Sequence, residues 1–84
     1  MGRLKLNLLV IDDDSLILEV MQALIPEPWQ FIGQTHYSAP PQTVHVAFVD
    51  LHLSEDFRKA DGLEVIQKIS QSNPHTEIVA ISGD

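Results

Sequence analysis

Acidic side chains follow two of the most apolar stretches of this sequence, and a hydroxyl follows a third. Asp12 and Asp13 come directly after the run LNLLVI, Asp50 ends the run VHVAFVD, and Ser82 follows EIVAI. If these runs are neighbouring strands, three carboxylates and a hydroxyl meet at one edge, where the carboxylates repel one another. A hard divalent cation relieves that repulsion, and Mg²⁺ binds carboxylates together with phosphate oxygens. These residues therefore indicate Mg²⁺-assisted phosphoryl chemistry.

Four strands and two helices are expected to position these side chains. Apolar residues recur at helical spacing after Ser15 and again after Gly62, and Pro26 and Pro74 stop the two helices. The expected strands cover residues 6–11, 29–37, 44–50 and 77–82, and the expected helices cover residues 15–25 and 63–70. Strands that alternate with helices are typical of a parallel α/β sheet with right-handed crossovers. The carboxyl ends of such strands share one edge, where functional groups gather.

Composition limits the class of protein. The 84 residues suffice for one domain, and no cysteine is present to form a disulfide or a thiolate site. The net charge of −7 argues against direct binding to nucleic acid, because phosphate contacts need clustered Lys and Arg. No apolar stretch is long enough to span a membrane, and the start of the chain lacks the pattern of a signal peptide. We therefore expect a single cytoplasmic domain over residues 1–84 that contacts neither nucleic acid nor membrane.

Four blocks of sequence, in their order and spacing, resemble the receiver domain of two-component response regulators. The blocks are LLVIDDDSLIL, VAFVDLHL, DGLEVIQKI and IVAISGD, and they extend over nearly the whole chain. The resemblance implies a flavodoxin-like receiver fold. It also implies a phosphorelay protein that accepts a phosphoryl group from a histidine kinase or a phosphotransfer protein. Such a protein is a phosphoacceptor rather than an enzyme, apart from dephosphorylating itself.

The resemblance assigns roles to the acidic residues. Asp50 is the implied phosphoacceptor, a carboxylate nucleophile that attacks the phosphorus of a phosphohistidine. Asp12 and Asp13 are the implied ligands of Mg²⁺ together with Asp50. The backbone carbonyl of His52 is a further implied ligand.

The resemblance also assigns roles near the end of the sequence. The hydroxyl of Ser82 is the implied switch that turns toward the phosphoryl group, and the N–H of Gly83 is an implied donor to a phosphoryl oxygen. A receiver normally continues with a helix, a strand that ends in a lysine and a last helix. Lys5, Lys59 and Lys68 do not stand at the position of that lysine. We therefore expect a truncated receiver fold that lacks the last helix-strand-helix, with strand order 2-1-3-4.

The fourth expected strand lies at an edge of that sheet. In the usual receiver a fifth strand covers it, so residues 78–81 are expected to present an apolar edge with unpaired backbone groups. Such an edge favours pairing with another strand. We therefore expect a homodimer through residues 78–81, built on a two-fold axis, and an atypical output.

Two other functions fit parts of the sequence. One is a pseudo-receiver that acts as a dimerisation or interaction module without phosphorylation, since the usual lysine and output elements are missing from these 84 residues. The other is a small phosphatase resembling the haloacid dehalogenase superfamily. In that case Asp12 is the nucleophile and Asp14 completes a D-x-D start, but Asp50 has no role.

Several other residues are expected to serve the fold rather than the site. Asp14 stands where a helix N-cap is needed. Trp29 and Phe31 are expected in the core. The histidines show no metal-ligand spacing and are expected at the surface or at strand ends: His36, His45, His52 and His75.

Overall fold

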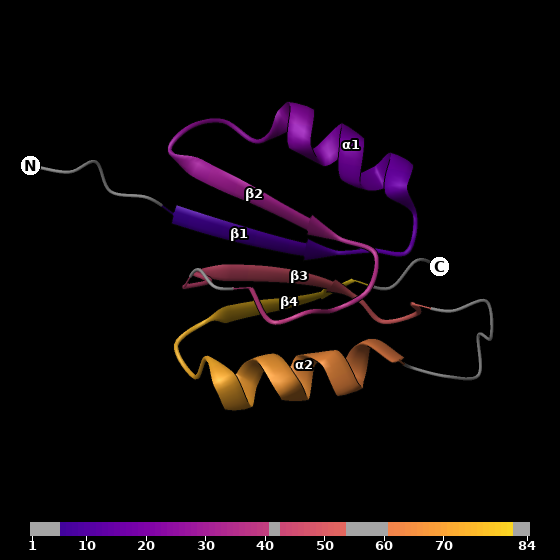
Figure 1. Ribbon diagram of the computed structural model, residues 1–84, viewed down its shortest axis with the longest axis vertical. Helices are drawn as coiled ribbons and strands as arrows, with labels where there is room; N and C mark the ends of the chain where they lie inside the picture. The colour runs from indigo at the N-terminus through magenta and orange to yellow at the C-terminus, as the bar shows by residue number, and fades with distance from the viewer. Residues whose placement is uncertain (1–5, 41–42, 54–60, 82–84) are drawn as a thin grey trace, which may run out of the picture.

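The computed structural model describes residues 6–40, 43–53 and 61–81. Its four strands form one sheet, and two helices lie against that sheet (Figure 1). The elements in chain order are β1 (Leu6–Ile11), α1 (Ser15–Leu24), β2 (Trp29–Gln34), β3 (Val46–Asp50), α2 (Asp61–Ser72) and β4 (Glu77–Ile81). Within the described residues, neither α1 nor α2 has the length and hydropathy that a membrane span requires.

The sheet has the predicted strand order. All three pairings are parallel, and the strands lie in the order β2-β1-β3-β4. The register sets Leu8 of β1 beside Phe31 of β2 and Val46 of β3. Side chains alternate between the two faces of a sheet, so these three residues share one face and their neighbours along each strand share the other. The prediction of a parallel α/β sheet with order 2-1-3-4 is confirmed.

One face of the sheet is closed by α2 and by the segment between β2 and β3. The fully buried side chains on this face come from β1, β3 and α2: Leu9, Ile11, Ala47, Val49 and Ile69. Tyr37 and Val44, from the connecting segment, pack against the same cluster. Burial of apolar surface stabilises a fold by roughly 25 cal/mol per Å², so this closed face is the main source of the domain's stability.

The other face is covered by α1 near β2 and is open farther along the sheet. Leu18 of α1 lies above Gly33 of β2, and Figure 1 shows α1 beside β2, with β4 at the far side of the sheet. Leu16 and Leu24 of α1 are 61% and 74% exposed, and Val79 of β4 is 42% exposed. This face therefore keeps a substantial exposed apolar surface.

Two strand boundaries differ from the prediction because side chains hydrogen-bond to the backbone, at a local turn after β2 and between distant residues before β3. β2 ends at Gln34 rather than at residue 37. The Gln34 amide donates to the carbonyl of Ser38 at 2.7 Å and accepts the N–H of Ser38 at 3.0 Å, which closes a turn. β3 begins at Val46 rather than at residue 44, because the N–H of Asn7 donates to the imidazole of His45 and not to a carbonyl.

Both ends of α1 follow from local chemistry, as predicted. Asp14 is the N-cap: its backbone is extended and its carboxylate accepts the N–H of Leu16 at 2.9 Å. At the other end the N–H of Ile25 donates to the carbonyl of Met21 at 3.0 Å. Pro26 follows at once and cannot continue the helix.

Candidate metal centre

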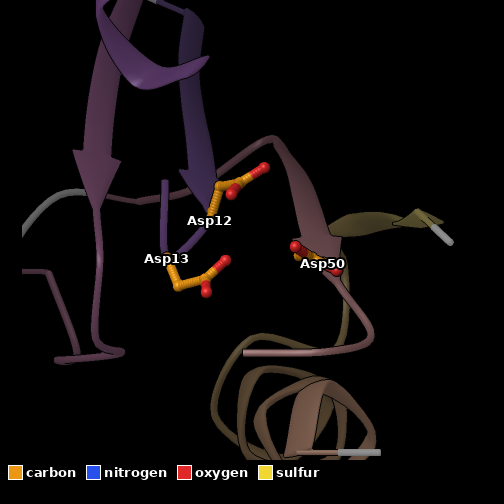
Figure 2. Close-up of side chains that lie close together, drawn as sticks. All are labelled: Asp12, Asp13 and Asp50. Atoms are coloured by element: carbon orange, nitrogen blue, oxygen red, sulfur yellow. The ribbon is translucent and has the colours of Figure 1, made fainter. Parts of the chain in front are cut away.

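Three carboxylates meet where β1 and β3 end (Figure 2). The register pairs Ile11 with Val49, so the residues that follow them, Asp12 and Asp50, emerge side by side. One oxygen from each of Asp12, Asp13 and Asp50 lies within 4.8 Å of the other two. Figure 2 shows the side chains around one space, with Asp12 and Asp13 on one side and Asp50 on the other. The structure thus brings together the three carboxylates that the sequence singled out.

Backbone hydrogen bonds hold Asp12 in place. Its N–H donates to the carbonyl of Gln34 at 3.1 Å, which extends the pairing of β1 with β2 past the end of the strand. Its Oδ1 accepts the N–H of Asp14 at 2.9 Å. Because Asp14 caps α1, the turn that carries Asp12 and Asp13 is tied both to β2 and to the first turn of α1.

Asp50 is oriented by the turn that follows β3. Its Oδ1 accepts the N–H of His52 at 2.9 Å, a local bond of the kind that aspartate makes to the backbone two residues on. The N–H of Leu51 donates to the carbonyl of Ile81 at 2.9 Å, so the pairing of β3 with β4 extends one residue beyond Asp50. The carboxylate is therefore oriented by the N–H of His52, and the backbone that carries it is held by the pairing with β4.

Gly62 allows α2 to begin close to this site. Its N–H donates to the carbonyl of Leu51 at 3.1 Å. A Cβ at this position would meet the carbonyl oxygen of Asp50 and would lie 2.7 Å from the Cα of Leu51. These are backbone atoms, so no rotation of a side chain relieves the overlap. This role of Gly62 was not predicted, and the Asp-Gly pair before the helical pattern was the only signal for it.

The pKa of the Asp12 carboxyl is raised above its ordinary value. Burial is the largest cause, and the negative charges of Asp50, Asp13 and Asp14 raise it further, while the hydrogen bond from the Asp14 backbone lowers it. The folded protein therefore holds this proton more tightly than the unfolded chain. Ionisation of Asp12 reduces stability as the pH rises through its pKa, and a bound cation offsets that loss.

The three oxygens fit a hard divalent cation. Mg²⁺ takes an octahedral set of oxygens at about 2.1 Å, which places adjacent ligand oxygens about 3 Å apart and opposite ones about 4.2 Å apart. The separations between these carboxylate oxygens are all within 4.8 Å, close to those values. The donor set contains no nitrogen or sulfur, which favours Mg²⁺ or Ca²⁺ over softer metals.

The remaining predicted site residues are His52, Ser82 and Gly83. The N–H of His52 orients Asp50, as described above, and the use of its carbonyl as a metal ligand stays a prediction. Ser82 and Gly83 lie outside the described residues. Their roles as switch hydroxyl and phosphoryl contact therefore also stay predictions.

Comparisons with known proteins find solved response regulators of the same fold. No protein-family model matches this chain, and no curated protein matches its sequence. A response regulator protein from Burkholderia pseudomallei, crystallised with a phosphorylated aspartic acid, a calcium ion and citrate, superposes with a TM-score of 0.78 at 23% identity. A response regulator from Thermotoga maritima has a TM-score of 0.72 at 16% identity, and a mutant of the response regulator MaeR bound to sulfate has 0.69 at 8%.

Each match covers nearly all of this chain but only part of the solved structure. They include 95% or 96% of this chain, but 48% of the Burkholderia chain, 69% of the Thermotoga chain and 70% of the MaeR chain. This chain thus spans about half the length of the first of them. Strand order, helix placement and superposition agree, and the chain has the flavodoxin-like fold of response-regulator receiver domains.

Proposed function

We propose that this chain is the receiver domain of a response regulator, with Asp50 as the phosphoacceptor and Mg²⁺ as the cofactor. The observation that carries the proposal is the meeting of Asp12, Asp13 and Asp50 at the carboxyl edge of a sheet with receiver strand order. The Burkholderia response regulator contains a phosphorylated aspartic acid and a calcium ion, which supports both an aspartyl phosphate and a divalent cation in this fold.

In the proposed reaction, an oxygen of the Asp50 carboxylate attacks the phosphorus of a phosphohistidine on a histidine kinase or a phosphotransfer protein. The new P–O bond forms as the P–N bond breaks. The departing imidazole keeps the electron pair of that bond, and it leaves as a neutral ring when its other nitrogen carries a proton. The product on this chain is an aspartyl phosphate, a mixed anhydride that water can hydrolyse.

The surrounding residues take supporting roles in this proposal. Asp12 and Asp13 hold the cation together with Asp50, and the carbonyl of His52 adds a ligand. When bound, Mg²⁺ offsets the negative charge of the phosphoryl oxygens and of the carboxylates. The hydrogen bond from the His52 N–H keeps the Asp50 carboxylate directed at the shared space. Ser82 is the proposed switch hydroxyl, and the Gly83 N–H is the proposed phosphoryl contact.

Beryllofluoride, which mimics a phosphoryl group on a carboxylate, tests this function. With Mg²⁺ present, it should shift the amide resonances of residues near the site in the native protein. Glu64→Gln removes one negative charge from the exposed side of α2 and should respond like the native protein. Asp50→Asn removes one negative charge from the site and should not respond. An equal response in Asp50→Asn and the native protein would sink the proposal.

We also infer a two-fold homodimer through the outer edge of β4. Among the described residues, β4 pairs only with β3. The N–H of Glu77 donates to the carbonyl of His45, and the carbonyl of Ile81 accepts from Leu51, so alternate residues of β4 direct their backbone groups toward β3. The backbone groups of Ile78 and Ala80 therefore face outward, where a second copy can pair with them.

Ala80→Pro tests the dimer without touching the pairing of β3 with β4. It removes an N–H that faces outward, so the dimer should dissociate while the fold is kept. Ala80→Ser, which retains the N–H, is the matched control and should stay dimeric in sedimentation. A native protein that sediments as a monomer at high micromolar concentration contradicts the dimer.

The two tests together separate the leading function from its main alternative. A stable dimer that binds no Mg²⁺ and ignores beryllofluoride would identify a phosphorylation-independent dimerisation module. In either case the proposed setting is the cytoplasm, and the proposed partners are proteins.

A further inference from the structure

The carboxyl end of β2 lies beside the candidate metal centre. Gln34 is the last residue of β2 and pairs with Ile11, the residue before Asp12. Its carbonyl accepts the N–H of Asp12 at 3.1 Å. Among the described residues, β2 pairs with β1 alone (Figure 1). The position of the Gln34 carbonyl therefore depends on β1 and on the chain that follows Gln34.

The side chain of Gln34 restrains the chain that follows it. The Gln34 carbonyl belongs to the peptide unit that joins residues 34 and 35, which is the first unit of a turn. The Gln34 amide closes that turn, because it donates to the carbonyl of Ser38 at 2.7 Å and accepts the N–H of Ser38 at 3.0 Å. Among hydrogen bonds between described residues, these two are the only ones that reach residues 35–40. The orientation of the Gln34 carbonyl is therefore restrained by its own side chain.

The turn is also anchored to the core of the domain. Tyr37, which lies between Gln34 and Ser38, packs against the buried cluster on the α2 side of the sheet. Ile32, two residues before Gln34, packs against the same cluster. These two contacts limit how the turn moves as a whole, while the amide bonds of Gln34 hold its shape. Gln34 therefore connects a packed segment to the backbone of Asp12.

Asp12 is held by one hydrogen bond on each side of its Cα. Its backbone N–H donates to Gln34, and its Oδ1 accepts the N–H of Asp14 at 2.9 Å. The Asp14 bond restrains the carboxylate, and the Gln34 bond restrains the backbone that carries it. Loss of either bond allows the Asp12 carboxylate to move relative to those of Asp13 and Asp50, with which it shares oxygen separations within 4.8 Å.

We infer that Gln34 is a positioning residue for the cation site. Its side chain raises the affinity for Mg²⁺ through the turn that it closes and through the bond from Asp12 to its carbonyl. This inference rests on the proposed function, since it takes Mg²⁺ to be the ion held by Asp12, Asp13 and Asp50. Mg²⁺ requires nearly ideal octahedral geometry, so a small displacement of one ligand lowers its affinity. Gln34 acts through Asp12 and is not itself a ligand.

A purely structural role for Gln34 predicts a different result. If its amide only ended β2, removing the amide would lower the stability of the fold. The Asp12 N–H and the affinity for Mg²⁺ would then stay unchanged. The two roles are therefore separated by measurements at Asp12 and on the cation, and not by unfolding alone.

Three substitutions with a matched design test the inference. Gln34→Leu keeps a similar side-chain volume and removes both amide bonds. Gln30→Leu makes the same change on the same strand and the same face, at an exposed position. Ser38→Ala removes a hydroxyl but keeps the backbone N–H and carbonyl that the Gln34 amide binds. Circular dichroism verifies the fold of each variant.

The first readout needs no cation. Hydrogen exchange of the Asp12 N–H, followed by NMR without divalent cations, should become about fivefold faster in Gln34→Leu, because the acceptor of that N–H is no longer held. The second readout is the Kd for Mg²⁺, followed by the amide resonances of Asp13 and His52. It should rise by about threefold to tenfold in Gln34→Leu, at the lower end of the effects typical of residues behind a metal ligand. Both quantities should keep their native values in Gln30→Leu and Ser38→Ala.

Three results would overturn the inference. They are native exchange of the Asp12 N–H in Gln34→Leu, a native Kd in that variant, and equal changes in Gln34→Leu and Gln30→Leu. Gln34→Asn, whose amide is one methylene shorter, should change both quantities in the same direction and replaces Gln34→Leu if leucine prevents folding. A native protein that binds no Mg²⁺ contradicts the proposed function together with the inference. Native binding that is unchanged in the Gln34 variants contradicts the inference alone.

Discussion

The two ends of the sheet differ in the interactions that their side chains make. At the carboxyl end, like charges converge, and the pKa of Asp12 is raised first by burial and then by the charges of Asp50 and Asp13. At the amino end, polar side chains form hydrogen bonds with backbone groups of neighbouring segments. The amino end therefore needs no ligand to offset repulsion, whereas the stability of the carboxyl end depends on the pH and, in our proposal, on a bound cation.

Hydrogen bonds at the amino end join three segments. The imidazole Nδ1 of His45 accepts the N–H of Asn7 at 3.0 Å, and the side-chain amide of Asn7 donates to the carbonyl of Thr43 at 2.7 Å. The hydroxyl of Thr76 donates to the carbonyl of Val44 at 2.7 Å. These bonds join β1 and the residue before β4 to the segment before β3, so they fix the entry of β3 into the sheet.

The largest expected effect comes from Gly62→Ala at the carboxyl end. The added Cβ meets backbone of Asp50 and Leu51, so either the start of α2 or the end of β3 must move. We expect a loss of about 2–3 kcal/mol in the free energy of unfolding, measured in urea, and weaker Mg²⁺ binding. The control is Gly33→Ala, whose Cβ would lie 2.8 Å from an atom of the Phe31 ring, which can rotate away. We expect that variant to change stability by less than about 1 kcal/mol. Equal losses in the two variants contradict the proposed clash at Gly62.

The next largest effect tests the amino end. His45→Ala leaves the N–H of Asn7 without its acceptor, and an unsatisfied N–H of this kind costs about 1–2 kcal/mol. His36→Ala, at an exposed position, should stay within about 0.5 kcal/mol of the native protein. Neither change should alter Mg²⁺ affinity, because both lie outside the site. A His45→Ala variant that is as stable as His36→Ala would remove the proposed role of this end.

Mg²⁺ should stabilise the carboxyl end by a comparable amount. At a concentration ten times its Kd, a ligand that binds only the folded state adds about 1.4 kcal/mol. For a domain of this size that corresponds to a Tm increase of about 6 °C or more, measured by thermal unfolding. Asp13→Asn should lose most of this increase, while Glu64→Gln should keep it. The same increase in both variants would show that Mg²⁺ acts elsewhere.

The smallest effect concerns pH in the absence of divalent cations. The pKa of Asp12 is raised in the folded state, so its contribution to stability is present at low pH and is lost as the pH rises above the ordinary carboxyl value of about 4. Asp12→Asn keeps an oxygen that can accept the Asp14 N–H but cannot ionise. The variant should therefore gain stability relative to the native protein as the pH rises from about 4 to 7, measured by urea unfolding at each pH. A difference that stays constant over this range contradicts the raised pKa.

Much of the fold could be predicted because its signals are local. Each apolar run ends in an acid or in turn residues, and Asp14 and Pro26 mark the ends of α1 within the sequence itself. The strand order followed from the receiver resemblance and from the handedness of parallel crossovers. The acidic cluster was predictable for the same reason, since the carboxyl ends of parallel strands share an edge.

What the sequence did not reveal depends on particular contacts with the backbone, most of them between distant segments. The end of β2 is set by the reach of the Gln34 amide to Ser38, and the start of β3 by the bond between Asn7 and His45. The need for glycine at position 62 arises only because α2 begins against the backbone of Asp50. The exposure of Val79 on the α1 side of the sheet could not be predicted either, since an apolar residue of a strand is expected in the core until its surroundings are known.

The bond between the Asp14 N–H and the Asp12 carboxylate has a thermodynamic consequence. One turn carries a proposed cation ligand and also caps α1. We therefore expect the binding of a cation and the formation of the first turn of α1 to be linked. Reciprocity then requires that any factor by which Mg²⁺ favours the formed turn equals the factor by which the formed turn raises the affinity for Mg²⁺.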